Sequence, residues 1–391
     1  MKQKIIFIPQ NKLTKRDFDR FGFSIFESRG FVIENWDVTP VLRAYYHKNF
    51  VDPEKFKYKK NKIFYTKKDI IEELKGLGKN SVVICILHID KENDFIFETM
   101  NNLNIKYGLI RITDHPENLN KKLLRKLRLI TFINLFKTNK KELINRIKKK
   151  LNNYFFSKEI KPRPSFIIVS GETTYNNYKN NYNEADIIKA HALDYNNFLD
   201  DTAKSNPYGR YAVFIDNNLP FHLDASWGSN KSEVFCDANK YFPEINKFFN
   251  DFSISTKLKV IIAAHPRSNY KEKKYYNERL VIKNSTVDLI KNSECVIMHQ
   301  STSVNYCVLY DKPILFINSN CLDINLRVRI NFLAEFFGQK PINISLNYFM
   351  PINYIHINKD IYKNYKKKHI KIDNTPEKNS WEIFCDYLDE I

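Results

Sequence analysis

Short apolar runs alternate along the chain with segments whose apolar residues recur every three or four positions. Continuous apolar runs are typical of strands buried on both faces of a parallel sheet, whereas the second pattern predicts amphipathic helices. The runs predict strands over 4–9, 31–36, 62–66, 81–87, 107–112, 165–170, 211–215, 259–264, 295–298 and 313–317. The periodic segments predict helices over 67–77, 94–103, 117–155, 233–252, 287–291, 301–310 and within 355–391. This alternation indicates an α/β fold with mostly parallel sheets.

Two polar segments interrupt the alternation. Residues 173–184 are rich in Asn and Tyr, and we expect a loop there. Residues 202–210 combine Ser, Asn, Pro and Gly, which mark a linker. A chain of 391 residues has room for two domains. We therefore expect one domain over 1–205, a second over 206–350 and a helical tail over 351–391 whose helix packs back on the first domain.

Glycine is scarce, with only nine in 391 residues, well below the usual share of about 7%. No three glycines fit G-x-G-x-x-G, and Glu73 stands where a P-loop ending at Gly78-Lys79 would need its first glycine. Both glycine-rich phosphate loops are therefore excluded. If the protein binds a phosphate, it does so by another device.

The cysteines and the apolar runs bear on location. None of the six cysteines forms C-x-x-C, and Cys85, Cys295 and Cys307 lie in apolar runs, as reduced core thiols do. The apolar stretch near the start is short, and no run approaches the roughly 18–20 residues of a membrane span. We expect a cytoplasmic protein without a signal peptide.

The formal net charge of +19 is concentrated. Residues 121–150 hold 12 Lys and Arg and one acid, interleaved with Leu, Ile and Phe. Such a helix can lie on the inner face of an anionic membrane, where each basic residue contributes about 1 kcal/mol. The alternative is a domain helix with a solvated basic side. Nucleic acid is a third partner that a basic patch can bind, but no RNA-binding or DNA-binding signature supports it.

A first candidate site is His265-Pro266-Arg267, directly after the predicted strand 259–264. Ligands of open α/β sheets bind beyond the carboxyl ends of the strands. His265 and Arg267 can both donate to an anion, and a histidine with an ordinary pKa near 6.5 can act as an acid. The alternative is a histidine that only caps the strand end.

A second candidate is His299 with Ser301-Thr302-Ser303, which follow the predicted strand 295–298 and open a helix. Hydroxyls and the unpaired N–H groups of a helix start can hold an anion without glycine. An ordinary Ser/Thr N-cap is the alternative.

Acidic residues give a third group. Asp216, His222 and Asp224 follow the strand 211–215 and could supply a base, a substrate clamp or, less plausibly, a metal pair. Solvated loop carboxylates are the alternative. Asp17-Phe18-Asp19 matches the D-x-D of metal-dependent transferases, but it lies among Lys and Arg and we interpret it as ion-paired surface.

The order of these motifs resembles the second half of GT-B glycosyltransferases that build bacterial surface polysaccharides. His265-Pro266 after one strand, Ser301-Thr302 after a later strand and Lys312–Phe316 (KPILF) carry the resemblance, chiefly over 211–318. The same pairing recurs in bacterial sialyltransferases, polysialyltransferases and Kdo transferases of capsule and lipopolysaccharide synthesis. Residues 30–37 and 192–195 look like segments of surface-carbohydrate biosynthesis proteins.

The resemblance implies two Rossmann-like domains that face each other across a cleft. It implies a CMP-sugar donor of sialic-acid or Kdo type, with no cofactor and no metal, and a glycan or lipid-linked acceptor. Its nucleotide phosphate would be bound by His265, Pro266, Arg267, His299, Ser301, Thr302 and Ser303. Many sialyltransferases carry their base in an acidic triplet that this chain lacks, so Glu172 and Asp216 remain alternatives, with His265 as the acid.

Two other functions stay open at this point. A transferase of teichoic-acid type, which moves a polyol phosphate from a CDP donor, also combines His-Pro with a Ser/Thr site. A non-enzymatic basic protein that binds membranes or nucleic acid would need none of these motifs. The two differ in their response to nucleotides, because only the transferase binds them.

Overall fold

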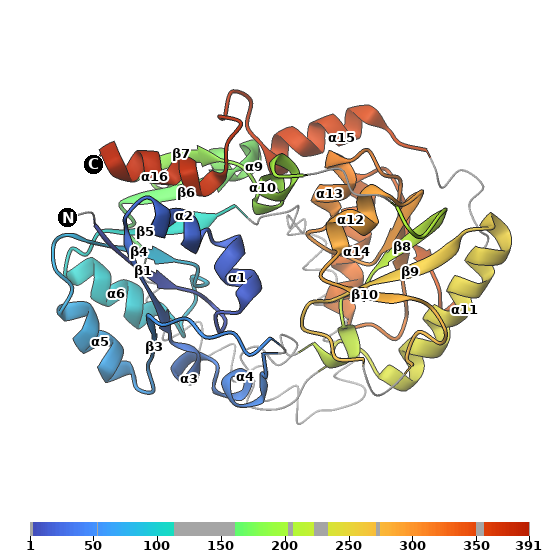
Figure 1. Ribbon diagram of the computed structural model, residues 1–391, viewed down its shortest axis with the longest axis horizontal. Helices are drawn as coiled ribbons and strands as arrows, with labels where there is room; N and C mark the ends of the chain where they lie inside the picture. Colours follow the sequence, from blue (N-terminus) through green and yellow to red (C-terminus); the bar gives the residue numbers. More distant parts are fainter. Residues whose placement is uncertain are drawn as a thin grey trace, which may run out of the picture.

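The computed structural model describes residues 3–52, 54–112, 161–201, 206–222, 234–270, 274–348 and 356–390. These residues form two α/β halves that lie side by side (Figure 1). The basic segment 121–150 and the linker residues 202–205 lie outside the described residues, so the predictions made for them stay predictions.

The first half is built on a parallel sheet, which has seven strands among the described residues, in the order β3-β2-β1-β4-β5-β6-β7. The strands are β1 (Lys4–Ile8), β2 (Val32–Asp37), β3 (Asn61–Ile63), β4 (Ser81–Cys85), β5 (Tyr107–Arg111), β6 (Phe166–Ser170) and β7 (Asp186–Ala190). Its helices are α1 (Lys15–Arg20), α2 (Phe23–Ser28), α3 (Thr39–Leu42), α4 (Ala44–Asn49), α5 (Lys67–Lys75), α6 (Asp94–Asn102) and α9 (Gly171–Asn181).

The second half has its own parallel sheet, of six strands among the described residues, in the order β10-β9-β8-β11-β12-β13. The strands are β8 (Tyr211–Ile215), β9 (Lys259–Ala264), β10 (Val281–Lys283), β11 (Cys295–Met298), β12 (Ile314–Asn318) and β13 (Ile342–Asn343). The helical elements are α10 (Leu193–Leu199), η1 (Leu219–Phe221), α11 (Ala238–Thr256), α12 (Thr286–Lys291), α13 (Val304–Leu309), α14 (Ile324–Phe336), α15 (Lys359–Tyr365) and the π-helix η3 (Lys366–Ile370). The order reverses between β8 and β11, as at the switch point of a Rossmann fold.

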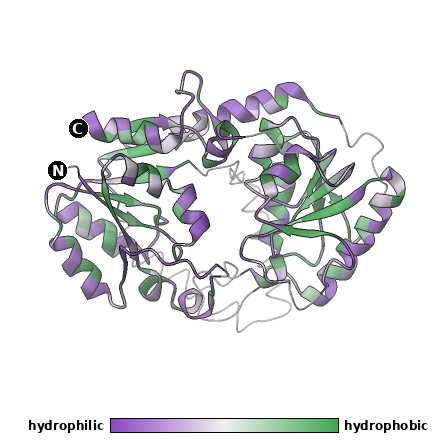
Figure 2. Ribbon diagram, viewed as in Figure 1, coloured by the Kyte–Doolittle hydropathy of each residue, from purple (hydrophilic) through white to green (hydrophobic). Residues whose placement is uncertain are grey.

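Hydrophobic burial explains both sheets. Strands such as β4, β6 and β8 are buried along their whole length, because helices cover both faces and leave no polar side. Each sheet separates two apolar clusters, one per face. Figure 2 shows the hydrophobic strands inside and hydrophilic residues on the outer helices. The predicted fold class, a GT-B-like pair of Rossmann-like halves, is confirmed. Cys85, Cys295 and Cys307 are buried free thiols, as predicted.

The C-terminal segment connects the two halves. Tyr362 and Tyr365 of α15 belong to the core of the second half, and η3 lies against α9 of the first half. The chain then returns to the first half, where α16 (Ser380–Glu390) inserts Trp381 and Phe384 into the core. The segment predicted as a separate tail therefore contributes to both cores. The two sheets fall on either side of the expected boundary at 205/206, and the exact bounds stay a prediction.

Some expected elements differ from the structure. The polar segment 173–184 is not a loop, because α9 begins at Gly171 and places Tyr175, Tyr178 and Tyr182 against the first core. The left-handed backbone of Gly171, with φ at 70°, lets the chain turn from β6 into this helix. The short strand β7 and the helix α14 were missed altogether.

We predict that Trp381→Ala lowers the unfolding free energy of the first half by about 3–5 kcal/mol, the usual range for a fully buried aromatic. Trp381 is 1% exposed, and its Nε1 donates to the carbonyl oxygen of Arg20 at 2.8 Å. Urea denaturation followed by fluorescence and circular dichroism would measure the change. Ile254→Ala, at a residue 69% exposed, is the control and should change stability by less than about 0.5 kcal/mol. Equal effects would contradict the packing described for α16.

Candidate functional site

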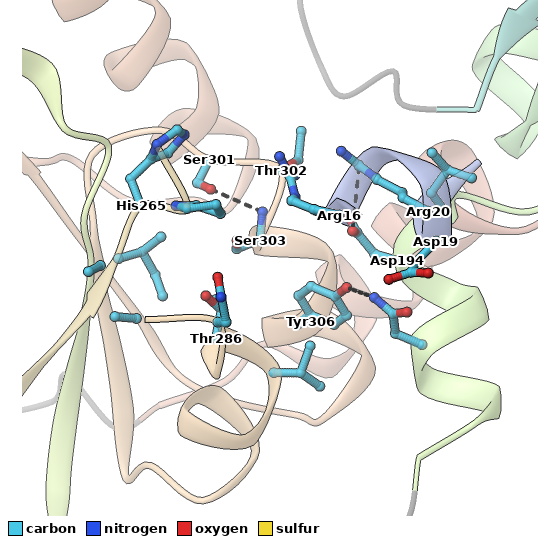
Figure 3. A pocket seen from close by; sticks show the side chains of 18 of the residues that line it. Arg16, Asp19, Arg20, Asp194, His265, Thr286, Ser301, Thr302, Ser303 and Tyr306 are labelled. Carbon is cyan, nitrogen blue, oxygen red and sulfur yellow. Dashed lines mark hydrogen bonds and ion pairs between the residues drawn. The ribbon is translucent and has the colours of Figure 1, made fainter. Parts of the chain in front are cut away.

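A cleft of about 840 Å³ lies between the two halves. Its walls include Arg16 and Arg20 of α1 on one side and Asp216, His265, Ser301 and Ser303 on the other. Figure 3 shows that the α1 arginines lie across the cleft from the serines. The second wall consists of residues that directly follow β8, β9 and β11, so the cleft opens at the switch point of the second sheet.

The segments after β8 and β11 are joined at the switch point. Asn217 Nδ2 donates to the carbonyl oxygen of Gln300 at 2.9 Å. The other amide atom, Asn217 Oδ1, is buried without a hydrogen-bond partner among the described residues. Both residues line the cleft. Buried polar atoms are nearly always satisfied, so an orphaned acceptor here indicates a place that a ligand or water completes.

Ser301, Thr302 and Ser303 form the hydroxyl loop of this site. Ser301 Oγ accepts a hydrogen bond from the backbone N–H of Ser303 at 3.1 Å. The following helix α13 begins only at Val304 and is six residues long, shorter than the predicted 301–310. Its dipole is therefore a small contribution, and the anion-binding capacity of the loop comes from its hydroxyls and backbone N–H groups.

His265 lies at the mouth of β9 and lines the cleft. Its Nδ1 accepts the backbone N–H of Arg267 at 3.1 Å, so the proton of the neutral ring is on Nε2. Burial, with the charges of His222, Arg267 and Arg16, holds the pKa of His265 well below its ordinary value of 6.5. The prediction that His265 is an acid with an ordinary pKa is therefore wrong for the ligand-free protein. In that state His265 is a neutral N–H donor.

Asp216 lines the cleft, but its carboxylate is fully occupied. Oδ1 accepts from Asn218 N and Tyr276 Oη at 2.8 Å each, and Oδ2 accepts from His265 N at 3.2 Å and Tyr270 Oη at 2.7 Å. Burial raises the pKa of Asp216, and these hydrogen bonds oppose that shift. The contacts describe a residue that positions the His265 turn, and they argue against Asp216 as the base.

His299 does not face the cleft. It is 0% exposed, its Nδ1 donates to the carbonyl oxygen of Ile317 at 2.9 Å, and Nε2 accepts from Tyr241 Oη at 3.0 Å. The prediction that His299 binds the nucleotide is therefore wrong. Side chains along β11 alternate between the two faces of the sheet. Cys295 and Ile297 face the side covered by α11, and His299, two residues further on, faces the same side. The sequence pattern could therefore have indicated that His299 is buried.

Glu172 also lies away from the cleft. It is in the first turn of α9, and its carboxylate pairs with Lys367 of η3 at 3.2 Å. It is absent from the residues that line the cleft in the described part of the chain. A base must reach the acceptor hydroxyl in the cleft, so this geometry argues against Glu172 in that role. Its ion pair with Lys367 instead indicates that Glu172 fixes the position of η3.

Arg267 and His222 line a neighbouring cavity of about 860 Å³. The Arg267 guanidinium lies 5.6 Å from the ring centre of Phe50, which belongs to the first half. The rings of His222 and His265 are 4.9 Å apart and nearly perpendicular, so they stand between the two cavities. Pro266 lines the cleft itself, and Asp224 lies outside the described residues.

The segment interpreted as ion-paired surface is a wall of the cleft. Lys15 and Asp19 do form an ion pair. Asp17, by contrast, is buried and accepts from Thr14 Oγ1 at 2.8 Å, so it supports Thr14, the N-cap residue of α1. Among the described residues no cluster of three or more His, Cys, Asp or Glu could hold a metal ion.

Sequence reasoning missed Arg16, Arg20, Asp194 and Arg329 as cleft residues. Asp194 is buried, accepts from Asn305 Nδ2 at 2.9 Å and lies 3.8 Å from the Arg20 guanidinium. Arg329 of α14 has a buried Nε with no hydrogen-bond partner in the described residues. These charged residues follow no periodic pattern in the sequence, so only the folded structure shows that they lie in one cleft.

We predict that His299 makes stability depend on pH. Burial lowers its pKa to about 4 from 6.5. Below pH 6.5 the unfolded chain takes up a proton that the folded protein cannot, so the unfolding free energy falls with pH by about 1.36 kcal/mol per unit, or about 2 kcal/mol by pH 5. His299→Gln should remove this contribution, so the stability lost between pH 7 and pH 5 in urea denaturation should be about 2 kcal/mol smaller in the variant. His191 and His265, whose pKa values burial also lowers, keep their own contributions. A constant difference between wild type and variant would contradict the prediction.

None of the described helices is long and apolar enough to cross a bilayer.

No protein-family model and no curated protein matches this sequence. Solved structures similar over nearly the full length include a UDP-GlcNAc 2-epimerase from Methanocaldococcus jannaschii (12% identity, TM-score 0.45, 99% of each chain covered). A putative epimerase from Listeria monocytogenes has 10% identity and a TM-score of 0.49, covering 100% of this chain and 98% of that one.

MurG from Acinetobacter baumannii has 8% identity and a TM-score of 0.46, with 100% of each chain covered. At this level the similarities carry no argument about substrate or reaction. The assignment of the fold rests on the two sheets and their strand order.

Proposed function

We propose that this protein is a metal-independent glycosyltransferase that uses a nucleotide sugar as donor. One observation carries the proposal: the switch point of the second sheet, with His265 and the hydroxyl loop, opens into a cleft that carries Arg16 and Arg20 of α1 on its other wall. A donor bound there would have its phosphate at the strand ends and its sugar in the space between the halves. The acceptor would reach the sugar from the first half.

His265 and the hydroxyl loop would meet the phosphate of the leaving nucleotide. His265 presents Nε2–H, because Nδ1 accepts from Arg267 N, and Ser301 and Thr302 add hydroxyl donors beside it. Donors fixed before the reaction stabilise charge as it develops on the leaving group. Arg329, whose Nε has no partner in the described residues, is a further donor in the same cleft. These groups do for the phosphate what a glycine-rich loop does elsewhere.

The proton acceptor is the second part of the mechanism. Among the cleft carboxylates, Asp216 is saturated with donors, Asp19 pairs with Lys15 and Glu54 accepts from Asn284. Asp200 also lines the cleft but is exposed to solvent. Asp194 is buried there; one oxygen accepts from Asn305 Nδ2, and the other lies 3.8 Å from the Arg20 guanidinium, beyond hydrogen-bond distance. We assign the base role to Asp194. It would take the proton of the acceptor hydroxyl as that oxygen attacks the anomeric carbon and the nucleotide leaves.

For the donor we propose a CMP-linked sugar of sialic-acid or Kdo type, transferred to a surface glycan or a lipid-linked acceptor. The support is the order of His265-Pro266, Ser301-Thr302 and Lys312–Phe316, which lie after β9, after β11 and at the start of β12 in one sheet. The CDP-polyol transferase fits the same wall. Contact with the inner membrane face rests on residues 121–150, outside the described residues, and remains part of the proposal.

Nucleotide binding tests the donor. Thermal unfolding with CMP, CDP, UDP and GDP should show a CMP-selective shift, because a ligand at about 100 times its Kd stabilises by about 2.7 kcal/mol. A CDP preference would favour polyol-phosphate transfer, and a UDP or GDP preference would discard the CMP donor but keep the fold. No shift with any nucleotide would contradict the glycosyltransferase and favour the non-enzymatic basic protein.

His265→Ala should lower turnover at least ~100-fold with folding intact, since removal of one preorganised donor typically costs about 3–4 kcal/mol in the transition state. The same variant should also reduce the nucleotide-dependent thermal shift. Lys68→Ala, at an exposed ion pair on α5, is the control for loss of a side chain. Wild-type turnover in His265→Ala would overturn the assignment of this site.

Asp194→Asn should abolish turnover while leaving the nucleotide-dependent thermal shift intact, because the amide keeps the shape of the carboxylate and cannot take a proton. A pH profile of the residual rate separates the base role from a positioning role: loss of the acidic limb supports the base. If Asp194→Asn retains the wild-type rate, Asp194 is not the base and another carboxylate has that role.

A further inference from the structure

Arg16 is a cleft-facing cation without an ion-pair partner among the described residues. It lies one turn before Arg20 on α1. Arg20 is 3.8 Å from Asp194, whereas Arg16 makes no hydrogen bond or ion pair in the described part of the chain. The nearby acids are engaged elsewhere, since Asp17 accepts from Thr14 Oγ1 and Asp19 pairs with Lys15.

The electrostatics of this wall are unfavourable in the empty cleft. Like charges one turn apart on a helix repel each other. Enclosure by the two halves, with the charges of Arg20 and Arg267, lowers the pKa of Arg16 to about 10, although Asp17 and Asp194 oppose the shift. Arg16, which is exposed to solvent in the cleft, therefore stays protonated at neutral pH. An anion beside it would remove the repulsion.

The position of Arg16 indicates which substrate would supply that anion. The donors assigned to the nucleotide phosphate, His265 and Ser301–Ser303, all belong to the second half, whereas α1 belongs to the first. Figure 3 shows Arg16 and Arg20 together on α1, across from the serines. In the proposed arrangement the substrate on the side of the first half is the acceptor, and Arg16 and Asp194 line the same cleft.

We propose that Arg16, with Arg20 beside it, binds an anionic group of the acceptor, a carboxylate or phosphate carried by the glycan. This inference rests on the proposed function, because it assumes that the second half holds the donor. A guanidinium fork matches both groups with two parallel hydrogen bonds. Binding there would hold the neighbouring acceptor hydroxyl at Asp194, so Arg16 is a specificity residue and not part of the nucleotide site.

The test separates the two substrates with defined probes. The protein is first saturated with whichever nucleotide stabilises it. Glucuronate, glucose 6-phosphate and glucose are then titrated at constant ionic strength, and thermal unfolding is followed. We expect the two anionic sugars to stabilise the wild type and glucose not to do so. Arg16→Ala should weaken anionic-sugar binding at least about tenfold, as expected for loss of a charged hydrogen bond, with the Kd of the nucleotide unchanged.

Matched variants make the result specific. Arg16→Lys keeps the charge but not the fork and should retain part of the affinity, while Lys68→Ala removes an exposed positive charge elsewhere in the first half and should retain all of it. Stronger stabilisation by glucuronate than by glucose 6-phosphate identifies a carboxylate acceptor, and the reverse order identifies a phosphate.

Three outcomes would overturn the inference. The first is equal stabilisation by glucose and the anionic sugars, and the second is anionic-sugar binding that survives Arg16→Ala. The third is a nucleotide Kd that rises in Arg16→Ala as it does in His265→Ala, because Arg16 would then serve the donor. Failure of the proposed function looks different, since no nucleotide would then stabilise the wild type, and the sugars can still be titrated against the nucleotide-free protein.

Discussion

The buried carboxylate of Asp216 fixes the wall on which the candidate site is built. Its two oxygens accept hydrogen bonds from the segment after β8, from the turn after β9 and from two tyrosines of the loop that follows that turn. Because the donors come from the segment after β8 and from the segment after β9, the carboxylate joins two segments that would otherwise end as separate loops. The position of His265 at the cleft depends on this connection, since one of the donors is its own backbone N–H.

The same arrangement explains how a chain poor in glycine can offer a phosphate site. Glycine-rich loops bring backbone N–H groups close to a phosphate by removing side chains. Here the Asn217–Gln300 hydrogen bond holds the switch point together, and hydroxyls and a neutral imidazole point donors into the space beyond it. Side-chain donors need a rigid support, and the strands β8 and β9, buried except for Lys259 at the start of β9, supply it.

The sequence predicted most of the strands but not the cleft, and it missed β7, β10 and β13, which lie at the edges of the sheets. Long apolar runs made most of the strands predictable, because a strand that is buried on both faces has apolar residues at successive positions, and this pattern is visible in its own sequence. The helix α9 was missed since its Asn and Tyr residues resemble a loop, and only packing of the tyrosines on the first core stabilises it. The first wall of the cleft was missed for another reason. The proposed role of Arg16 and Arg20 depends on residues of the second half that lie across the cleft. No pattern in the sequence around α1 indicates that these residues lie there.

Two histidines that follow strands in the same way have opposite roles, and strand parity accounts for the difference. His299 continues the alternation of β11 toward the apolar cluster under α11, where Tyr241 and the Ile317 carbonyl satisfy both ring nitrogens. His265 follows Ala264, and Pro266 turns the chain after it, so its ring leaves the sheet at the cleft. A histidine whose nitrogens are both held by the core cannot meet a ligand without breaking those bonds. One whose Nδ1 is held by its own turn keeps Nε2–H for a ligand. The parity of the histidine in its strand, together with the turn at Pro266, therefore decides which of the two contributes to the site.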